Sequence, residues 1–348
     1  MPADQGATRT EYFETTDYPL ELGGRLAKAR IAYEAYGKLA PDGRNALLLT
    51  HGFTSSHHAA GRNSENGNQP GWWNGLVGPG KAIDTDRLFV VASNMLGSSY
   101  GSTNARDIDP ATGKPYGPTF PDITVSDIIG LQRRMLEQLG VKHLVAVAGN
   151  SYGGFQAFQW AVDHPDFMDA IVPVVTAPAS PRRAYPELLA RIAADPGWNG
   201  GWYYDRPGGV TETMRAIRYE TLKRYGADEV LADEGLDPAA RDAKMRAQAA
   251  AWADRFDAHS LLILRKAADR FDTTGRFDRI RAKVLYVIAR TDVLFPPEIA
   301  PDVMARLKAA EIDAEYFEID TEYGHTASGA DWGKWEAPLR RFLEPLVP

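Results

Sequence analysis

Short apolar runs alternate with amphipathic stretches along this chain. The runs are five to eight residues long, and their length and apolar centres predict strands, most of them buried. They occupy residues 45–50, 88–93, 144–148, 169–176, 283–289 and 314–319. The stretches between them carry apolar residues at helical spacing and predict helices at residues 126–139, 154–164, 297–310 and 331–343. Strands that alternate with helices predict an α/β fold with a mostly parallel sheet covered on both faces.

The N-terminal region differs from this pattern. We expect residues 1–12 to be a loose tail. Two further strands are predicted within residues 18–36, joined by a turn at Gly23 and Gly24.

The pattern changes again between residues 177 and 276. No run there predicts a buried strand, and Pro and Gly separate helical stretches at residues 184–194, 211–225, 238–255 and 261–271. We therefore expect an all-helical insertion at 177–276, with residues 1–176 and 277–348 forming the core.

The stretch from Leu144 to Phe155 carries the strongest chemical signal. It reads L-V-A-V-A-G-N-S-Y-G-G-F, a buried strand followed by G-x-S-x-G and a helix. This context predicts a nucleophile elbow, a sharp turn that holds Ser151 above the sheet at the positive end of a helix. The glycines fit because a side chain beside such a turn would strike the neighbouring backbone.

Two further residues complete a catalytic triad in the chain order of α/β-hydrolases, Ser151, Asp292 and His325. Asp292 and His325 follow the ends of two neighbouring predicted strands, so both should reach the edge of the sheet where Ser151 lies. A serine needs an imidazole to take its proton, and the imidazole needs a carboxylate to orient it. The oxyanion donors should be the amides of Tyr152 and Phe53, with Gly52 as the alternative to Phe53.

Composition narrows the function further. The 348 residues carry a net charge of −7 without a basic block, so we do not expect the protein to bind nucleic acid.

Cysteine is absent from the sequence, so disulfides and thiolate catalysis are excluded. The polar N-terminus and the absence of a long apolar run lead us to expect a cytoplasmic protein without membrane contact. His51, His57 and His58 lack metal-ligand spacing, so we expect neither a metal nor a cofactor.

Several long motifs resemble the homoserine O-acetyltransferase family. They are G-W-W-N-G-L-V-G-P-G-K-A-I-D-T-D-R-L-F-V-V-A-S-N (71–94), Y-G-S-T-N (100–104), D-P-A-T-G-K-P-Y-G-P-T-F-P (109–121), D-P-G-W-N-G-G-W-Y-Y (195–204) and D-V-L-F-P-P (292–297). The resemblance implies an α/β-hydrolase fold with a helical lid, often a homodimer through that lid, and ping-pong acyl transfer through an acyl-serine. It also places Ser151, Asp292 and His325 on the family's triad.

The chain departs from the family where the acceptor would bind. The family's transferases have an Asp after the histidine, which holds the amino group of homoserine, whereas Thr326 stands here. In the lid the family has an Arg and, seven residues on, a Tyr near the substrate. Matching Arg215 to the first puts Leu222 at the second. The elbow reads G-N-S-Y-G-G rather than the usual G-G-S-M-G-G, and the oxyanion loop reads H-G-F-T rather than H-A-L-T.

These departures favour a serine hydrolase of small carboxylic esters with short acyl chains, in which water is the acceptor. The alternative is an O-acyltransferase that uses acetyl-CoA as co-substrate and homoserine or another alcohol as acceptor. A non-catalytic binding protein is a third reading, which the intact triad disfavours. An apolar pocket without a charged clamp would support the hydrolase.

Overall fold

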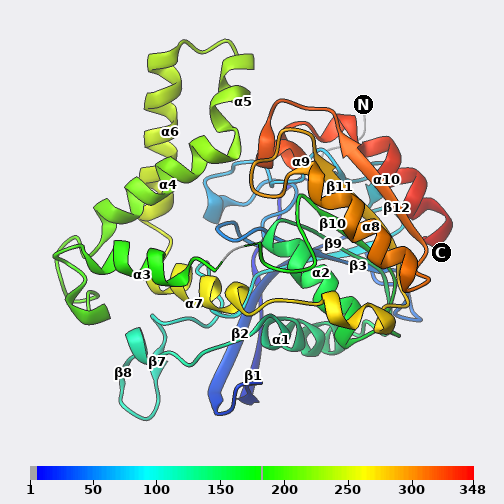
Figure 1. The fold of residues 1–348 in the computed structure, drawn as a ribbon. Helices are drawn as coiled ribbons and strands as arrows, with labels where there is room; N and C mark the ends of the chain where they lie inside the picture. Colours follow the sequence, from blue (N-terminus) through cyan, green and yellow to red (C-terminus); the bar gives the residue numbers. More distant parts are fainter. Residues whose placement is uncertain (1–5, 182) are drawn as a thin grey trace.

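An eight-stranded sheet forms the centre of the molecule in the computed structural model, which describes residues 6–181 and 183–348 (Figure 1). The strands are, in sheet order, β1 (Glu11–Pro19), β2 (Arg25–Tyr36), β6 (Phe89–Ser93), β3 (Ala46–Thr50), β9 (Leu144–Asn150), β10 (Met168–Val174), β11 (Lys283–Ala289) and β12 (Ala314–Ile319). β1, β2 and β6 pair antiparallel, and the pairs from β6 to β12 are parallel. Two small sheets, β4 (Val77–Gly78) with β5 (Ile83–Asp84) and β7 (Ile108–Asp109) with β8 (Lys114–Pro115), lie in the long loops.

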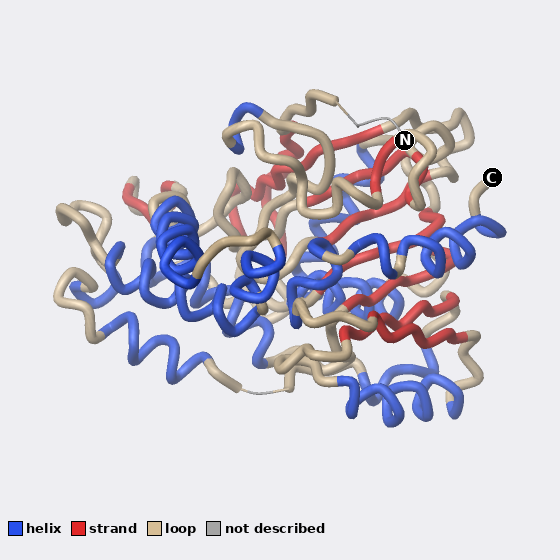
Figure 2. The backbone as a smooth tube through the Cα atoms, turned by 90° about the horizontal axis from the view of Figure 1, so that it is seen from above, coloured by secondary structure: helices blue, strands red, loops and turns tan. Residues whose placement is uncertain are grey.

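Helices lie on both sides of the strands, as Figure 2 shows. Those outside the insertion are α1 (Val125–Gln138), α2 (Tyr152–Asp163), α8 (Ala300–Ala309), α9 (Ala327–Ala330) and α10 (Glu336–Leu343). One face of the sheet packs against α1, α2 and α8, and the other packs against α10 and the loop that carries Trp73. Successive residues of one strand enter opposite cores, as Leu48 and Leu49 of β3 do, because side chains alternate across a sheet. This confirms the predicted α/β-hydrolase fold.

Two local predictions differ from the structure. The first strand begins at Glu11, inside the stretch expected to be a tail, because its polar side chains alternate with only a few buried ones, as suits an edge strand. Helix α1 begins at Val125, one residue before the predicted start, because Thr124 caps it and forms a reciprocal capping box with Asp127.

Between β10 and β11 the described chain is helical. The helices there are α3 (Tyr185–Ala193), α4 (Thr211–Tyr225), α5 (Ala227–Asp233), α6 (Pro238–Ala253) and α7 (Ala258–Asp269). Figure 1 shows α4, α5 and α6 projecting away from the sheet. We call residues 177–276 the helical insertion; these exact boundaries remain a prediction. Across the described ranges no helix is both long and apolar enough to span a bilayer.

The helical insertion begins and ends at one place. Ala179 and Asp272 form an antiparallel bridge, the amide of Ser180 donates to the carbonyl of Phe271 (3.1 Å), and the amide of Thr273 donates to that of Pro178 (2.9 Å). We call this pairing of residues 178–180 with 271–273 the neck.

Candidate active site

The turn between β9 and α2 places Ser151 in a strained conformation. Its φ is 56° and its ψ is −118°, in a region that side chains rarely adopt. Neighbouring backbone over-determines the turn, since a Cβ on Gly153 would strike the carbonyl of Thr50. The amide of Ser151 donates to Val174 O (2.9 Å), and its carbonyl accepts from the Thr176 hydroxyl (2.7 Å). This is the geometry of a nucleophile elbow.

The three residues predicted as a triad meet at the carboxyl ends of the strands. His325 Nε2 lies 2.8 Å from Ser151 Oγ, and His325 Nδ1 lies 2.8 Å from Asp292 Oδ2. Because a carboxylate oxygen accepts, Nδ1 carries the proton and Nε2 is left to accept from the serine hydroxyl. The other oxygen of Asp292 accepts from the amides of Leu294 (2.8 Å) and Phe295 (3.2 Å), which fixes the carboxylate. Asp292 and His325 are both buried.

The predicted oxyanion donors lie beside the nucleophile. A Cβ built on Gly52 would be 3.6 Å from the Cβ of Ser151, and the rings of Phe53 and Tyr152 stack with centroids 5.7 Å apart. The amides of Phe53 and Tyr152 donate to no other residue that the structure describes. They are therefore free to bind a developing negative charge, and the role itself remains our proposal.

A cavity of about 630 Å³ opens above Ser151, between the core and the helical insertion. Phe53, Phe155, Leu188, Trp252, Leu261 and Phe295 supply most of its apolar wall. Four arginines also line it: Arg191, Arg218, Arg224 and Arg265. Arg191 pairs with Glu220, and Arg265 pairs with Asp269. The cavity therefore combines an apolar wall with cationic groups, rather than the purely apolar lining expected of a simple esterase.

Arg218 differs from the paired arginines of the cavity because its guanidinium has no carboxylate partner among the described residues. It is half-buried on α4, its Nη1 donates to the hydroxyl of Thr54 (2.7 Å) beside the oxyanion loop, and its guanidinium lies 5.4 Å from the ring of Trp252. Its Nε is buried without a hydrogen-bond partner, and none of the described carboxylates forms an ion pair with it. Burial lowers the pKa of Arg218. A half-buried cation without a counter-charge is suited to an anionic ligand.

Arg215, which the sequence pointed to as the substrate-binding arginine, lies elsewhere. It forms ion pairs with Glu212 (2.7 Å) and Asp254 (3.0 Å) and does not line the cavity. Leu222, seven residues after Arg215, does not correspond to the family's Tyr either, because it packs between the helices of the insertion. On α4 the positions 218, 221 and 225 share the face that lines the cavity, whereas Arg215 lies outside that face.

The same Arg-to-Tyr spacing of seven, taken three residues further on, selects Arg218 and Tyr225. The ring of Tyr225 packs edge-on against His325 at 4.7 Å, and Tyr225 lines the cavity. Burial raises the pKa of Tyr225, which keeps its hydroxyl protonated. Applying the spacing to every arginine of this stretch would have found the pair from sequence.

Thr326 directly follows His325 but has no charge to offer a ligand. It is half-buried, its hydroxyl donates to the carbonyl of Tyr323 (2.7 Å), and it is not among the residues that line the cavity. The position at which the family's transferases have an Asp therefore supplies no charged group to the cavity here.

The three neighbouring histidines are held by protein groups. His51 lies between Gly52 O (2.8 Å) and Asn94 Oδ1 (2.9 Å), and His58 contacts the carboxylate of Glu34. His57 contacts the Thr10 hydroxyl, and burial lowers its pKa to about 4. Within the described ranges no three His, Cys, Asp or Glu side chains are grouped so that they could hold a metal ion.

Comparison with known proteins agrees with this architecture. Residues 45–328 match the alpha/beta hydrolase fold. The homoserine O-acetyltransferase of Symbiobacterium thermophilum is 38% identical, over 94% of this chain and 92% of that protein.

Two solved structures are similarly close. Esterase E22 superimposes with a TM-score of 0.88 at 28% identity, covering 97% of this chain and 100% of that one. The homoserine O-acetyltransferase from Bacillus anthracis superimposes with a TM-score of 0.88 at 26% identity, covering 98% and 99%. The chain therefore belongs to the homoserine O-acetyltransferase family, within the α/β-hydrolase fold.

Proposed function

We propose that this protein is an O-acyltransferase that moves an acetyl group from acetyl-CoA to the hydroxyl of homoserine or a similar hydroxy acid. The observation that carries the proposal is Arg218, whose guanidinium lines the cavity above Ser151 without a described carboxylate partner. An amino-acid acceptor brings a carboxylate, which a guanidinium binds bidentately, whereas a simple ester and water bring none. The names of the curated relatives support the same reaction.

The reaction would proceed in two half-reactions at Ser151. His325 takes the hydroxyl proton as Ser151 Oγ attacks the thioester carbonyl, and the oxyanion is met by the amides of Phe53 and Tyr152. The carbon–sulfur bond then breaks, the thiol leaves with the proton from His325, and Ser151 is acylated. In the second half, His325 takes the proton of the acceptor hydroxyl, which attacks the acyl-serine. The new ester leaves, and the proton returns to Ser151.

Ester hydrolysis, our first expectation from sequence, becomes the second candidate. Thr326 favours it, because a hydroxyl that already donates to Tyr323 O cannot balance the ammonium group of homoserine as a carboxylate would. The similarity to esterase E22 points in the same direction. Both candidates share the acyl-serine and differ only in the acceptor.

The test measures thiol release from acetyl-CoA with and without homoserine, beside hydrolysis of p-nitrophenyl acetate, on the same preparation. We expect thiol release that rises with homoserine concentration and saturates. Ser151→Ala serves as the control and should remove both activities, because the acyl group then has no nucleophile to accept it.

The outcomes separate the candidates. Rapid ester hydrolysis with no homoserine-dependent thiol release would contradict transfer and establish the hydrolase. Activity that survives in Ser151→Ala would contradict both readings.

A further inference from the structure

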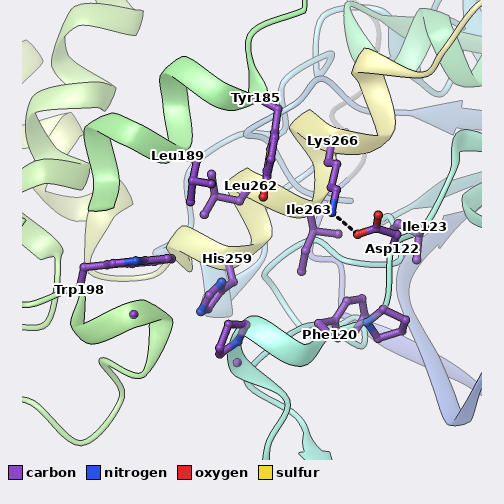
Figure 3. Close-up of a pocket in the computed structure, with 14 residues that line it drawn as sticks. Phe120, Asp122, Ile123, Tyr185, Leu189, Trp198, His259, Leu262, Ile263 and Lys266 are labelled. Atoms are coloured by element: carbon purple, nitrogen blue, oxygen red, sulfur yellow. Dashed lines mark hydrogen bonds and ion pairs between the residues drawn. The ribbon is translucent and has the colours of Figure 1, made fainter. Parts of the chain in front are cut away.

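A second cavity, of about 290 Å³, is lined by α3 and α7 of the helical insertion and by the loop before α1, and it shares no lining residue with the cavity above Ser151 (Figure 3). Helix α7 supplies Leu261 and Arg265 to the catalytic cavity and His259 and Ile263 to the second one. Helix α3 does the same with adjacent leucines, Leu188 for the catalytic cavity and Leu189 for the second. The two cavities are therefore separate sites that share one wall.

The walls of the second cavity are mostly apolar and partly aromatic. Trp198 and Phe120 lie at opposite sides of the space, and Leu189, Leu262 and Ile263 close it from above in Figure 3. The aromatic rings of Trp198 and His259 are in contact, with centroids 5.0 Å apart. Concave sites of this kind, apolar with few polar groups, are typical of small-molecule binding.

His259 is the polar side chain of this cavity that can orient a bound ligand through a hydrogen bond. It is 5% exposed, and its Nε2 contacts the carbonyl of Gly201 at 2.8 Å. A carbonyl only accepts, so Nε2 carries the proton, and burial lowers the pKa of His259 and keeps the ring neutral. Its Nδ1 is then a lone-pair acceptor, and the hydrogen bonds that His259 forms within the described part of the chain use only its amide and Nε2.

The charges at the other end of the cavity are engaged with one another. Lys266 Nζ lies 2.6 Å from Asp122 Oδ1, and Arg270 contacts the other oxygen of the same carboxylate at 2.8 Å. The ammonium of Lys266 also lies 5.3 Å from the ring of Tyr185. A ligand in this cavity therefore needs a hydrogen-bond donor for His259 Nδ1, and it needs no charge to balance Lys266 or Asp122.

We propose that this cavity binds a small, neutral, planar aromatic molecule that bears one O–H or N–H group. The ring would lie between Trp198 and Phe120, and the donor would bind His259 Nδ1. Phenol-type and indole-type molecules share this chemistry. The proposal does not depend on the reaction at Ser151.

The experiment titrates the purified full-length protein with 4-fluorophenol and, separately, with 4-fluoroanisole, and follows the ¹⁹F resonance of each. The two probes have similar rings, but the anisole has no hydrogen to donate. We expect a saturable shift with 4-fluorophenol and binding about tenfold weaker with 4-fluoroanisole, because a buried acceptor left unpaired penalises the complex. His259→Phe keeps an aromatic ring and should reduce the affinity for 4-fluorophenol by a similar factor.

A matched pair of variants identifies the cavity. Leu189→Trp fills the second cavity from its half-buried rim and should abolish the shift, whereas Leu188→Trp, its neighbour, fills the catalytic cavity and should leave the shift unchanged. Thermal melting of each variant verifies that it is folded. A shift lost in Leu188→Trp and kept in Leu189→Trp would place the probe at the catalytic cavity and overturn the proposal. So would the absence of saturation in the millimolar range, or equal affinity for both probes.

Discussion

At the scale of single residues, Arg218 offers the most direct test of the acceptor. Arg218→Leu removes the guanidinium from the cavity, and we expect the KM for homoserine to rise by about ten- to a hundredfold, as for loss of a charge-assisted hydrogen bond. Hydrolysis of the neutral ester p-nitrophenyl acetate should change little. Steady-state kinetics with both substrates measure the difference.

Arg215→Leu is the matched control for that measurement. It removes an arginine from the same helix, but one that pairs with Glu212 and Asp254 outside the cavity. Equal effects of the two substitutions on the KM for homoserine would show that Arg218 has no special place in acceptor binding.

We expect Asp292 to affect the rate of the reaction by orienting and stabilising His325, and not by binding the substrate. Asp292→Asn keeps an oxygen that can accept from the amides of Leu294 and Phe295, but it no longer stabilises the imidazolium that forms during the reaction. We expect kcat to fall about 10⁴-fold with an unchanged melting temperature. A loss below about tenfold would show that another group orients His325.

The triad was predictable from sequence because the elbow motif fixes one member, and because strand ends on a parallel sheet bring the other two to the same edge. Arg218 and Tyr225 were missed because the seven-residue spacing was counted from Arg215, and because the sequence did not show which face of α4 lines the cavity. Helical spacing alone does not give that face, because α4 buries residues such as Met214 and Leu222 elsewhere in the insertion.

At the scale of elements, the buried strands were predicted well and the edge and short elements were not. β11 has the predicted bounds because a strand buried inside a sheet must be apolar throughout or nearly so. β12 is the exception, an edge strand with mostly exposed or half-buried side chains whose bounds were nevertheless predicted. β1 was missed since an edge strand needs few apolar residues. α5 was missed because it follows α4 after the single residue Gly226, whose φ of 95° ends one helix and admits the next.

Asp257 ties the helical insertion to the core. It caps α7 through the amide of His259 (2.9 Å), and it also accepts from Arg106 (2.9 Å), Tyr203 (3.0 Å) and Tyr204 (3.2 Å). The Asp257 side chain is 2% exposed, so its removal would leave the His259 amide and the Tyr203 hydroxyl without this partner inside the protein, whereas Arg106, 67% exposed, can turn to solvent.

We expect Asp257→Ala to lower the free energy of unfolding by about 3 kcal/mol, measured by urea denaturation. Asp237→Ala is the comparison, because Asp237 caps α6 through one amide bond on an exposed surface (2.9 Å). That change should cost about 1 kcal/mol or less. Equal costs would mean that Arg106, Tyr203 and Tyr204 add nothing to the cap.

At the scale of the whole molecule, a buried ion pair joins the N-terminal strands to the long loop after β3. Glu34 on β2 is fully buried, and its carboxylate accepts from His58 (3.0 Å), Asn63 (2.7 Å) and Tyr36 (2.7 Å). Burial alone would raise the pKa of Glu34, but these hydrogen bonds outweigh it and hold the pKa below 4.5. Burial likewise opposes the charge on His58, but Glu34 outweighs it and raises the pKa of His58 above 6.5.

This pair predicts how stability depends on pH. His58 contributes fully to the free energy of unfolding below pH 6.5, and this contribution is lost as the pH rises through the raised pKa of His58. The contribution of Glu34 is full above pH 4.5 and is lost as the pH falls through its lowered value. We therefore expect His58→Gln to cost about 3 kcal/mol of unfolding free energy between these values, and less as the pH is raised toward 9.

His143→Gln provides the control. His143 pairs with Asp169 at 2.8 Å, and because the Asp169 side chain is 46% exposed, removal of the pair costs about 1 kcal/mol or less. Denaturation of both variants over a pH series measures the effect. A cost of His58→Gln that does not vary with pH would show that the pair is not charged.

The neck has a consequence for how this family diversifies. Because residues 178–180 and 271–273 are hydrogen-bonded to each other, some ninety residues of intervening chain meet the core as a loop with touching ends. Closing such a loop costs nearly the same free energy over a wide range of lengths. Descent can therefore replace, shorten or lengthen the helical insertion while the sheet and the triad are inherited intact.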